Sequence, residues 1–261
     1  MPVITTIANH KGGVGKTMIT LMLGAHLAQH GHRVLLVDCD PQANLSRRVG
    51  YAEQELAQRP SVSEAIRDAS PDVLAAAILP CQWEEDWADR IDIVPARKEL
   101  QQRSAESGMP ASWTRLKRAL AAAEGYDHVL IDTPPELGPL VHNALVASQW
   151  VVMAADPEFD AYKGIHRLQE FLAGVEGQAL GITARIAGIV INHFRTRVTT
   201  HEERLAEARA TWGDLVWSPP VPLTIKIQNT SEFSEPPQAA GPDVQVIAEE
   251  IGNAYLRAVA A

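Results

Sequence analysis

The chain has 261 residues, of which 46% are apolar and 21% are charged, a composition typical of a globular protein. Its formal net charge of −9 excludes a protein that coats nucleic acid over its whole surface, although a local basic patch can still bind phosphates. No apolar stretch approaches the roughly 20 residues that span a bilayer, and no signal peptide precedes the first strand, so we expect one cytoplasmic domain covering residues 1–261.

The first predicted elements enclose a glycine-rich loop. A strand is predicted from Val3 to Ala8, the run NHKGGVGKT occupies residues 9–17, and a helix is predicted from Lys16 to His30. The three glycines of this run let backbone N–H groups turn toward an anion at the positive end of the helix. Lys16 can reach the outer phosphates, and the Thr17 hydroxyl can hold magnesium. The sequence therefore predicts a nucleoside triphosphate site. Its candidate binding residues are Gly12, Gly13, Val14, Gly15, Lys16, Thr17 and Met18.

This loop departs from the generic P-loop pattern. His10 stands where that pattern has glycine, and a second lysine, Lys11, lies at the start of the loop. The run KGGVGKT resembles the deviant Walker A loop of the ParA/MinD family of ATPases. The resemblance implies that Lys11 is the signature lysine that reaches across a dimer to the partner's ATP, and it implies catalytic roles for Lys11 and Lys16. An ordinary solvated lysine is the alternative for Lys11.

The second predicted strand, Arg33 to Val37, leads into two carboxylates, Asp38 and Asp40, within the run DCDPQAN. Carboxylate oxygens suit magnesium, and an acceptor is needed to orient the water that attacks a γ-phosphate. The run is similar to the family's switch I, which implies that Asp40 positions this water and that Asp38 belongs to the magnesium shell. Helix caps are the alternative for two acids after a strand.

The segment from residue 51 to residue 89 has weaker periodicity and is predicted to be a variable helical insert. Further along, a predicted strand from His128 to Ile131 ends at Asp132. Asp132 looks like a Walker B carboxylate, and the run DTPPELGPLVHNAL resembles the family's switch II and the helix after it. Asp132 is therefore expected to hold magnesium, by accepting a hydrogen bond from Thr17 or from a magnesium-bound water.

The rest of the chain alternates between apolar runs and helical periodicity. The further predicted strands are Ile91 to Val94, Trp150 to Ala154 and Ala184 to Ile191. The further predicted helices are Ser112 to Ala123, Pro139 to Ala147, Tyr162 to Val175, Thr200 to Thr211 and Val244 to Val259. The proline-rich segment from Ser218 to Pro242 is predicted to be a long ordered loop. This alternation predicts an α/β fold, a doubly wound and mostly parallel sheet with helices on both faces and ligands at the carboxyl ends of the strands.

Two places near the end of the predicted sheet resemble those where the family contacts adenine. Asn192 closes the last predicted strand, and Pro222 and Leu223 lie in the proline-rich segment. The resemblance implies that Asn192 pairs with the base edge while Pro222 and Leu223 cover its face. A turn residue is the alternative for a strand-end asparagine.

Basic residues gather in the second half of this acidic chain. They are Arg185, Arg195, Arg197, Arg204, Arg209 and Lys226. The stretches that hold Arg195, Arg197 and Lys226 resemble regions where partition ATPases bind the DNA backbone without sequence preference, so these three are the candidate DNA-binding residues. A solvated basic face is the alternative.

With three motifs in the family's order, the chain resembles ParA/Soj-type chromosome or plasmid partition ATPases. The resemblance implies ATP and Mg²⁺ as cofactors, an ATP-dependent homodimer, non-specific double-stranded DNA as a partner, association with the nucleoid, and a ParB-like protein that stimulates hydrolysis. An ATPase of this kind that positions a protein cargo, such as a chemotaxis array or a microcompartment, is the open alternative. An amide-forming enzyme of the same fold is more distant.

A MinD-type membrane-cycling ATPase is disfavoured. Such a protein needs a C-terminal amphipathic helix with basic and bulky apolar residues for the lipid interface. Residues 254–261 are too small and too weakly basic for that role. We therefore expect no membrane partner.

Overall fold

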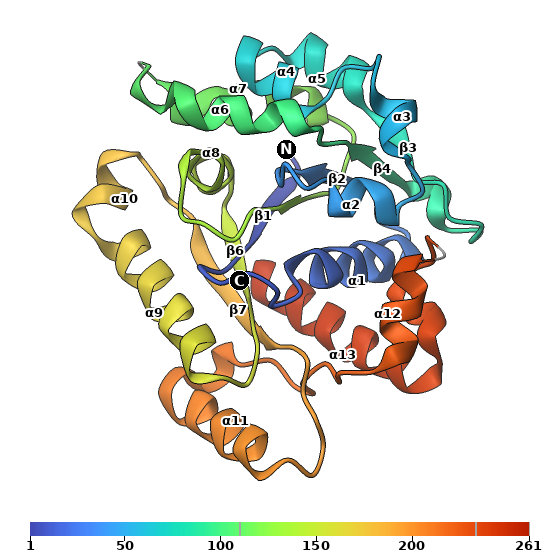
Figure 1. Ribbon diagram of the computed structural model, residues 1–261, viewed down its shortest axis with the longest axis vertical. Helices are drawn as coiled ribbons and strands as arrows, with labels where there is room; N and C mark the ends of the chain where they lie inside the picture. Colours follow the sequence, from blue (N-terminus) through green and yellow to red (C-terminus); the bar gives the residue numbers. More distant parts are fainter. Residues whose placement is uncertain (110, 233, 261) are drawn as a thin grey trace.

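The computed structural model describes residues 1–109, 111–232 and 234–260. Within these residues, seven strands form one sheet in the order β3-β4-β2-β5-β1-β6-β7 (Figure 1). The strands are Val3–Ala8 (β1), Val34–Asp38 (β2), Leu79–Pro80 (β3), Ile91–Val94 (β4), His128–Asp132 (β5), Trp150–Ala155 (β6) and Arg185–Ile191 (β7). Strand β3 pairs antiparallel with β4, and the other strand pairings are parallel. The predicted doubly wound, mostly parallel α/β sheet is confirmed.

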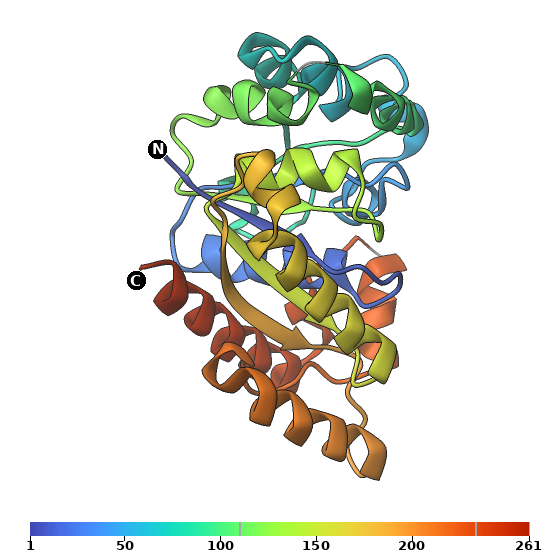
Figure 2. The same ribbon diagram turned by 90° about the vertical axis from the view of Figure 1, so that its left-hand side faces the viewer.

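Helices cover both faces of this sheet (Figures 1 and 2). The longer helices are Lys16–Gln29 (α1), Pro139–Ala147 (α8), Phe159–Ala173 (α9), Thr199–Trp212 (α11), Ile225–Glu232 (α12) and Pro242–Val259 (α13). The shorter helices are Asn44–Arg48 (α2), Glu53–Leu56 (α3), Val62–Asp68 (α4), Pro71–Ala77 (α5), Gln101–Ala105 (α6), Arg115–Ala119 (α7) and Val175–Ala179 (α10). In Figure 1, α1 and α13 lie on one side of the sheet, and α7 and α8 lie on the other.

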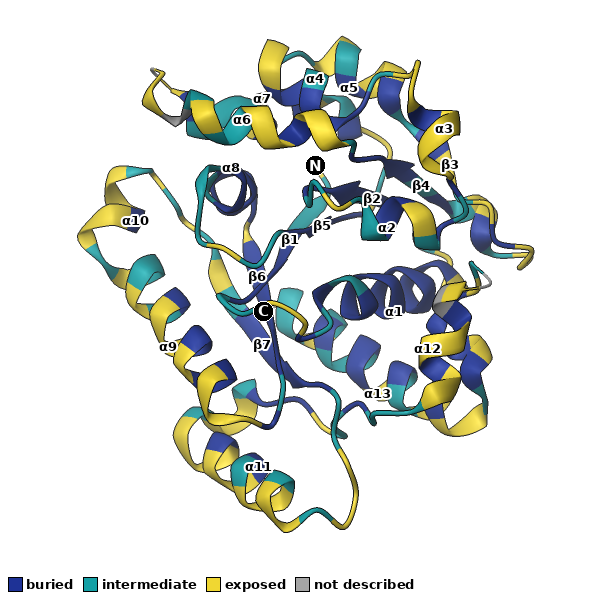
Figure 3. Cartoon of the chain, viewed as in Figure 1, coloured by how far each residue is buried: buried dark blue, intermediate teal, exposed yellow. Residues whose placement is uncertain are grey.

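The strands are continuous apolar runs because both faces of the sheet are covered. Along β2, Val34 and Leu36 pack into the hydrophobic cluster that includes α1, whereas Leu35 and Val37 pack into the cluster that includes α4 and α8. This alternation follows the two-residue repeat of a strand. In Figure 3 the strands and most of α1 are buried, while the outer helices α9 and α11 expose one face. The sheet therefore divides the core into two layers and holds the loops at its edge.

The six long strands agree with the sequence prediction to within one residue at each end, whereas β3 was not predicted. It has two residues and contains Pro80, so it lacks the apolar run by which a strand is recognised. The predicted insert at residues 51–89 contains α3, α4 and α5 as well as β3. The two cysteines are free, Cys39 buried and Cys81 partly buried.

The prediction of a long loop from Ser218 to Pro242 was wrong. This segment contains α12 and a 3₁₀ turn at Pro237–Ala240. Prolines lie on both sides of α12, but none lies within it, so they bound a short helix instead of preventing one. Elsewhere the predicted helix ends lie within one turn of those observed, although Ser112 to Ala123 is regular α-helix only at Arg115–Ala119. No helix in the described ranges is long and apolar enough to cross a bilayer.

Candidate functional site

The loop between β1 and α1 is shaped by two glycines. Gly13 has a φ of 78° and Gly15 a φ of 82°, a left-handed conformation that residues with a Cβ rarely adopt. A Cβ on Gly15 would also lie 1.8 Å from Asn192 Nδ2, so a side chain has no room there. Because α1 begins at the next residue, the loop leads directly to the unpaired N–H groups of a helix N-terminus, which favour an anion.

Lys16 is the first residue of α1, and its side chain is buried. Its Nζ donates a hydrogen bond to the carbonyl oxygen of Lys11 across 3.3 Å. Burial lowers the pKa of Lys16, while the carboxylates of Asp132 and Asp40 act in the opposite direction. The ammonium group therefore lies against the backbone of the loop, within the electrostatic influence of both carboxylates, where it can bind the phosphates of a ligand.

The predicted contact between Thr17 and Asp132 is present. The Thr17 hydroxyl donates to Asp132 Oδ2 across 2.5 Å, joining the first turn of α1 to the carboxyl end of β5. Asp132 is almost fully buried, and burial raises its pKa to about 6. A hydroxyl and a carboxylate at the mouth of the loop are the hard oxygen donors that magnesium prefers.

Asp38 lies deeper than expected. It is fully buried at the end of β2, opposite Asp132 in the strand register, and it does not line the pocket formed by the described residues. Its Oδ2 accepts hydrogen bonds from the backbone N–H and the hydroxyl of Ser46, at 2.9 and 2.7 Å. Burial, followed by repulsion from Asp132, raises the pKa of Asp38 to about 7. The charge of Asp132 thus opposes the ionisation of Asp38.

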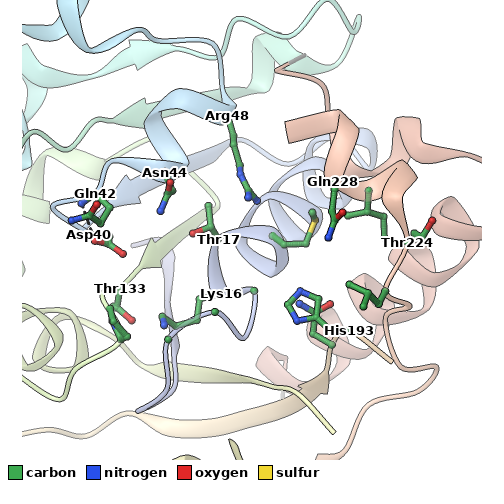
Figure 4. A pocket seen from close by; sticks show the side chains of 18 of the residues that line it. Lys16, Thr17, Asp40, Gln42, Asn44, Arg48, Thr133, His193, Thr224 and Gln228 are labelled. Atoms are coloured by element: carbon green, nitrogen blue, oxygen red, sulfur yellow. Dashed lines mark hydrogen bonds between the residues drawn. The ribbon is translucent and has the colours of Figure 1, made fainter. Parts of the chain in front are cut away.

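Asp40 follows β2 and lines the same pocket as Lys16 and Thr17. Its Oδ1 accepts a hydrogen bond from the backbone N–H of Gln42 across 2.9 Å. In Figure 4, Asp40 and Thr133 lie on one side of Lys16 and Thr17. The structure thus brings together most of the groups that the three sequence motifs supply.

The pocket has a volume of ≈ 550 Å³, within the range of small-molecule sites. Of the predicted binding residues, the following line it: Gly12, Gly13, Gly15, Lys16, Thr17, Met18, Asn192, Pro222 and Leu223. Val14 is fully buried behind the loop instead. Several lining residues were not predicted: Arg48, His193, Thr224, Ile227, Gln228 and Glu232. In Figure 4, His193, Thr224 and Gln228 lie on the side away from Asp40.

Arg48, at the end of α2, is the cation that the sequence analysis missed. Its side chain points toward Thr17 in Figure 4, and its guanidinium makes no hydrogen bond or ion pair with any described residue. Burial lowers its pKa, and the charge of Asp132 opposes that shift. No local sequence signal marks Arg48, because its place in the pocket depends on how α2 packs after the Asp38 turn.

Asn192 lies at the end of β7 and is anchored to the loop. Its Nδ2 donates to the Val14 carbonyl oxygen across 3.1 Å. The chain then continues to Phe194, which forms a parallel β-bridge with Pro222, so the two segments predicted to meet a base are held side by side. Backbone bonds from Phe194 N to Val221 O and from Leu223 N to Phe194 O secure this bridge.

Lys11 does not line the pocket of its own chain. Its Nζ lies 2.6 Å from Glu158 Oε2 and 4.0 Å from Asp156 Oδ2. The Glu158 side chain is 61% exposed, so this ion pair is a weak surface contact. Asp156 also bonds His193 Nδ1, across 2.7 Å, which connects the Lys11 region to the far side of the pocket.

The candidate DNA-binding residues lie on the two bridged segments. Arg195 and Arg197 follow Phe194, Lys226 follows Thr224, and all three side chains are exposed. The other basic residues that were considered make contacts elsewhere: Arg185 over Trp150, Arg204 with Glu207 and Arg209 with Ser218. Arg195, Arg197 and Lys226 are therefore exposed basic residues on the segments that contribute His193 and Thr224 to the pocket.

Comparison with known proteins gives a consistent result. A family model described as an AAA domain matches residues 2–182. The chromosome partitioning protein ParA of Caulobacter vibrioides is 33% identical over 89% of this chain and 85% of its own length. The chromosome-partitioning ATPase Soj of Thermus thermophilus is 33% identical over 88% of this chain and 84% of its own.

Among solved structures, the chain is similar to cobyrinic acid a,c-diamide synthase from Mycobacterium smegmatis with bound ATP analogue and magnesium. The two share 28% identity and superpose with a TM-score of 0.79, over 98% of this chain and 95% of the other. The similarity extends over nearly the whole chain and includes the elements that form the pocket.

Proposed function

The chain belongs to the ParA/Soj-type ATPases, and we propose that it is an ATP-driven dimerisation switch for the segregation of chromosomal or plasmid DNA. In this proposal the ATP-bound dimer binds non-specific double-stranded DNA, and a ParB-like partner stimulates hydrolysis. The observation that carries the proposal is the α1 N-terminus, where buried Lys16 and the Thr17–Asp132 pair lie beside Lys11.

We assign the triphosphate to the glycine loop and Lys16, and magnesium to Thr17, Asp132 and Asp38. The donor set fits Mg²⁺ because it consists of hard oxygen atoms. A cation would also offset the causes that raise the pKa values of Asp38 and Asp132, which are burial first and then the charge of a neighbouring carboxylate. When bound, Mg²⁺ neutralises charge on the phosphates. Asp40 holds the attacking water as hydrogen-bond acceptor, since its carboxylate faces the same pocket.

We assign the adenine to the side of the pocket formed by Asn192, Pro222 and Leu223. Because Asn192 Nδ2 is committed to Val14, its Oδ1 is the atom that we expect to accept from the exocyclic amine of the base. Pro222 and Leu223 supply apolar surface to one face of the ring.

Lys11 is the residue that we assign to the dimer. In the monomer it is held by Glu158, so a partner's triphosphate must outcompete one exposed carboxylate. Lys11→Ala is expected to abolish ATP-dependent dimers, measured by light scattering, while Lys163→Ala, which changes another exposed lysine, retains them. Asp40→Ala is expected to accumulate ATP-bound dimers that do not hydrolyse. Intact dimers in Lys11→Ala would refute its role.

Binding to DNA is assigned to Arg195, Arg197 and Lys226. We expect ATP-dependent binding to random duplex DNA that weakens steeply with salt, because lysine and arginine release counterions from the phosphates. Arg195→Glu and Lys226→Glu are expected to lose this binding. Lys117→Glu, the same charge reversal at an exposed lysine on α7, should keep it. If both charge reversals beside the pocket bind like the parent chain, another surface contacts DNA.

A cargo-positioning ATPase and an amide-forming enzyme are the two alternatives, and each would need a different partner or substrate for ATP turnover. A lysine- and arginine-rich peptide from a ParB-like protein should stimulate hydrolysis if the cargo is DNA, whereas a cargo-positioning ATPase responds to its own protein assembly. The similarity to a diamide synthase favours an amide-forming enzyme as the second candidate. ATP consumption that requires a carboxylate substrate and an amine donor would identify that activity.

A further inference from the structure

The far end of α1, opposite the glycine loop, carries a second group of polar side chains. His26 lies in the last turns of α1, His30 caps the helix one turn later, and Glu249 faces both from α13. One ligand atom from each residue lies within 4.8 Å of the others. These residues come from two helices that pack side by side on the same face of the sheet (Figure 1).

His26 is the buried member of this group. Its side chain is 1% exposed, and neither ring nitrogen has a hydrogen-bond partner among the described residues. Nδ1 lies 3.3 Å from Glu249 Oε2, close enough for an ion pair, but without the direction of a hydrogen bond. Burial removes water from a polar atom, so an unpartnered ring nitrogen is costly unless another ligand satisfies it.

The spacing of the donor atoms fits a metal ion between them. His30 Nε2 lies 3.3 Å from Glu249 Oε1, the same separation as on the His26 side. Zinc binds nitrogen and oxygen ligands at about 2.0 Å, so two ligand atoms of a tetrahedral ion lie about 3.3 Å apart. Each of these two separations, one to each oxygen of Glu249, has that length. Two histidines one turn apart on a helix are also a recurrent pair of zinc ligands.

The surrounding hydrogen bonds orient the ligands. His30 Nδ1 lies 2.8 Å from the His26 carbonyl oxygen, which only accepts, so Nδ1 carries the hydrogen and Nε2 keeps its lone pair toward Glu249. Metal-binding histidines commonly donate their second nitrogen in this way. Asn253 Nδ2 donates to Glu249 Oε1 across 3.3 Å, which positions the carboxylate.

We infer that His26 Nδ1, His30 Nε2 and the Glu249 carboxylate form a zinc site that joins α13 to α1, with the fourth position open to water. The ion supplies the partner that His26 lacks and replaces a loose histidine–glutamate contact by bonds from both helices. This site is separate from the nucleotide pocket, since none of the three residues lines it.

Zinc titration of the full chain, without nucleotide and with excess Mg²⁺, tests this inference. Competition with a chromophoric chelator should show one Zn²⁺ bound per chain, and Zn²⁺ should raise the melting temperature. His30→Ala and Glu249→Gln should each weaken binding by about tenfold or more and remove this rise. Both side chains are partly exposed, at 40% and 47%, so these variants are expected to fold.

Matched controls separate this site from general zinc binding. His166→Ala and Glu250→Gln change an exposed histidine and an exposed neighbouring glutamate, and they should bind Zn²⁺ like the parent chain. Co²⁺ should give visible absorption typical of tetrahedral coordination in the parent and the controls only. Absence of Zn²⁺ binding by the parent chain, or unchanged binding in both ligand variants, would overturn the inference. ATP binding is measured independently, so neither result depends on the proposed ATPase cycle.

Discussion

The polar side chains in and around the nucleotide pocket form two groups, an anchored part and an open part, that are held in different ways. The anchored part consists of residues bonded within the chain: Thr17, Asp38, Asp132 and Asn192. The open part consists of two cations: Arg48, which has no described partner, and Lys11, which has an exposed one. The comparison teaches that the side chains we propose for magnesium and adenine are already held by hydrogen bonds within the chain, while two positive charges are able to change partners.

Among the changes to the anchored part, a substitution at Gly15 should have the largest effect on stability. Gly15→Ala adds a Cβ that would lie 1.8 Å from Asn192 Nδ2 in a left-handed conformation, so Asn192 must leave Val14. We expect nucleotide-free Gly15→Ala to lose about 3 kcal/mol of unfolding free energy in urea. Gly13→Ala shares the positive φ but meets no atom within 4 Å, and it should lose about 1 kcal/mol. Equal losses would contradict the anchored role of Asn192.

Arg48 tests the open part. If this guanidinium is kept for an anionic ligand, Arg48→Ala should weaken ATP binding by about tenfold, the value of one charge-assisted hydrogen bond. Arg47→Ala is the matched control, because Arg47 lies next to it on α2 but is exposed and does not line the pocket. Calorimetric titration with Mg²⁺ and ATP measures both. A similar affinity for the two variants would mean that Arg48 does not bind the ligand.

The paired carboxyl groups of the anchored part predict a pH dependence for the protein without nucleotide or divalent metal. The folded pKa values of Asp38 and Asp132 are raised to about 7 and about 6, above the ordinary aspartate pKa of about 3.9. Between about pH 4 and pH 7 the folded chain therefore binds more protons than the unfolded chain, and its stability falls as pH rises.

Asp38→Asn should flatten this decline, because it removes one of the two buried carboxyl groups whose pKa is raised. Melting temperatures at pH 5 and pH 7.5 measure the slope, and Asp89→Asn, at an exposed carboxyl, should leave it unchanged. An unaltered slope in Asp38→Asn would show that the buried pair does not control the pH response.

The smallest effect is expected from a substitution that frees Lys11 from its ion pair with Glu158. Glu158→Gln removes an exposed ion pair, which typically contributes less than about 1 kcal/mol, so ATP-dependent dimerisation should strengthen by no more than about fivefold. Glu170→Gln, at an exposed glutamate on α9, the helix that begins directly after Glu158, should leave it unchanged. Analytical ultracentrifugation over a range of protein concentrations compares the variants. Weaker dimers in Glu158→Gln would mean that Glu158 supports the interface instead of competing for Lys11.

The parts of the site that could be predicted from the sequence follow local rules. The strand, the glycine turn and the helix that form the phosphate loop are contiguous in the chain. Residues 9–17 therefore indicate the pocket from local sequence alone. Asp132 was predicted because an apolar strand ends at this acid, which resembles a Walker B carboxylate, and parallel strands end at the same edge of the sheet. The long strands were predictable for a similar reason, since burial on both faces requires continuous apolar runs.

The rest depends on contacts between distant segments. Arg48 enters the pocket through the packing of α2, and the Lys11–Glu158 pair joins residues 147 positions apart. Asp38 was predicted as a metal-shell residue, but periodicity does not reveal that Ser46 covers it. Helix α12 was missed because the segment from Ser218 to Pro242 is rich in proline as a whole, although the eight residues of the helix contain none.

The β-bridge between Phe194 and Pro222 offers a way to follow the pocket optically. Thr196 is exposed two residues beyond this bridge and does not line the pocket. A fluorescent dye attached at position 196 would therefore report changes in the segment around Phe194 without touching a bound nucleotide. Burial raises the pKa of both native thiols, that of Cys81 to about 12, which leaves them un-ionised at neutral pH. A cysteine introduced at position 196 would therefore be labelled before either of them, in the otherwise unaltered chain.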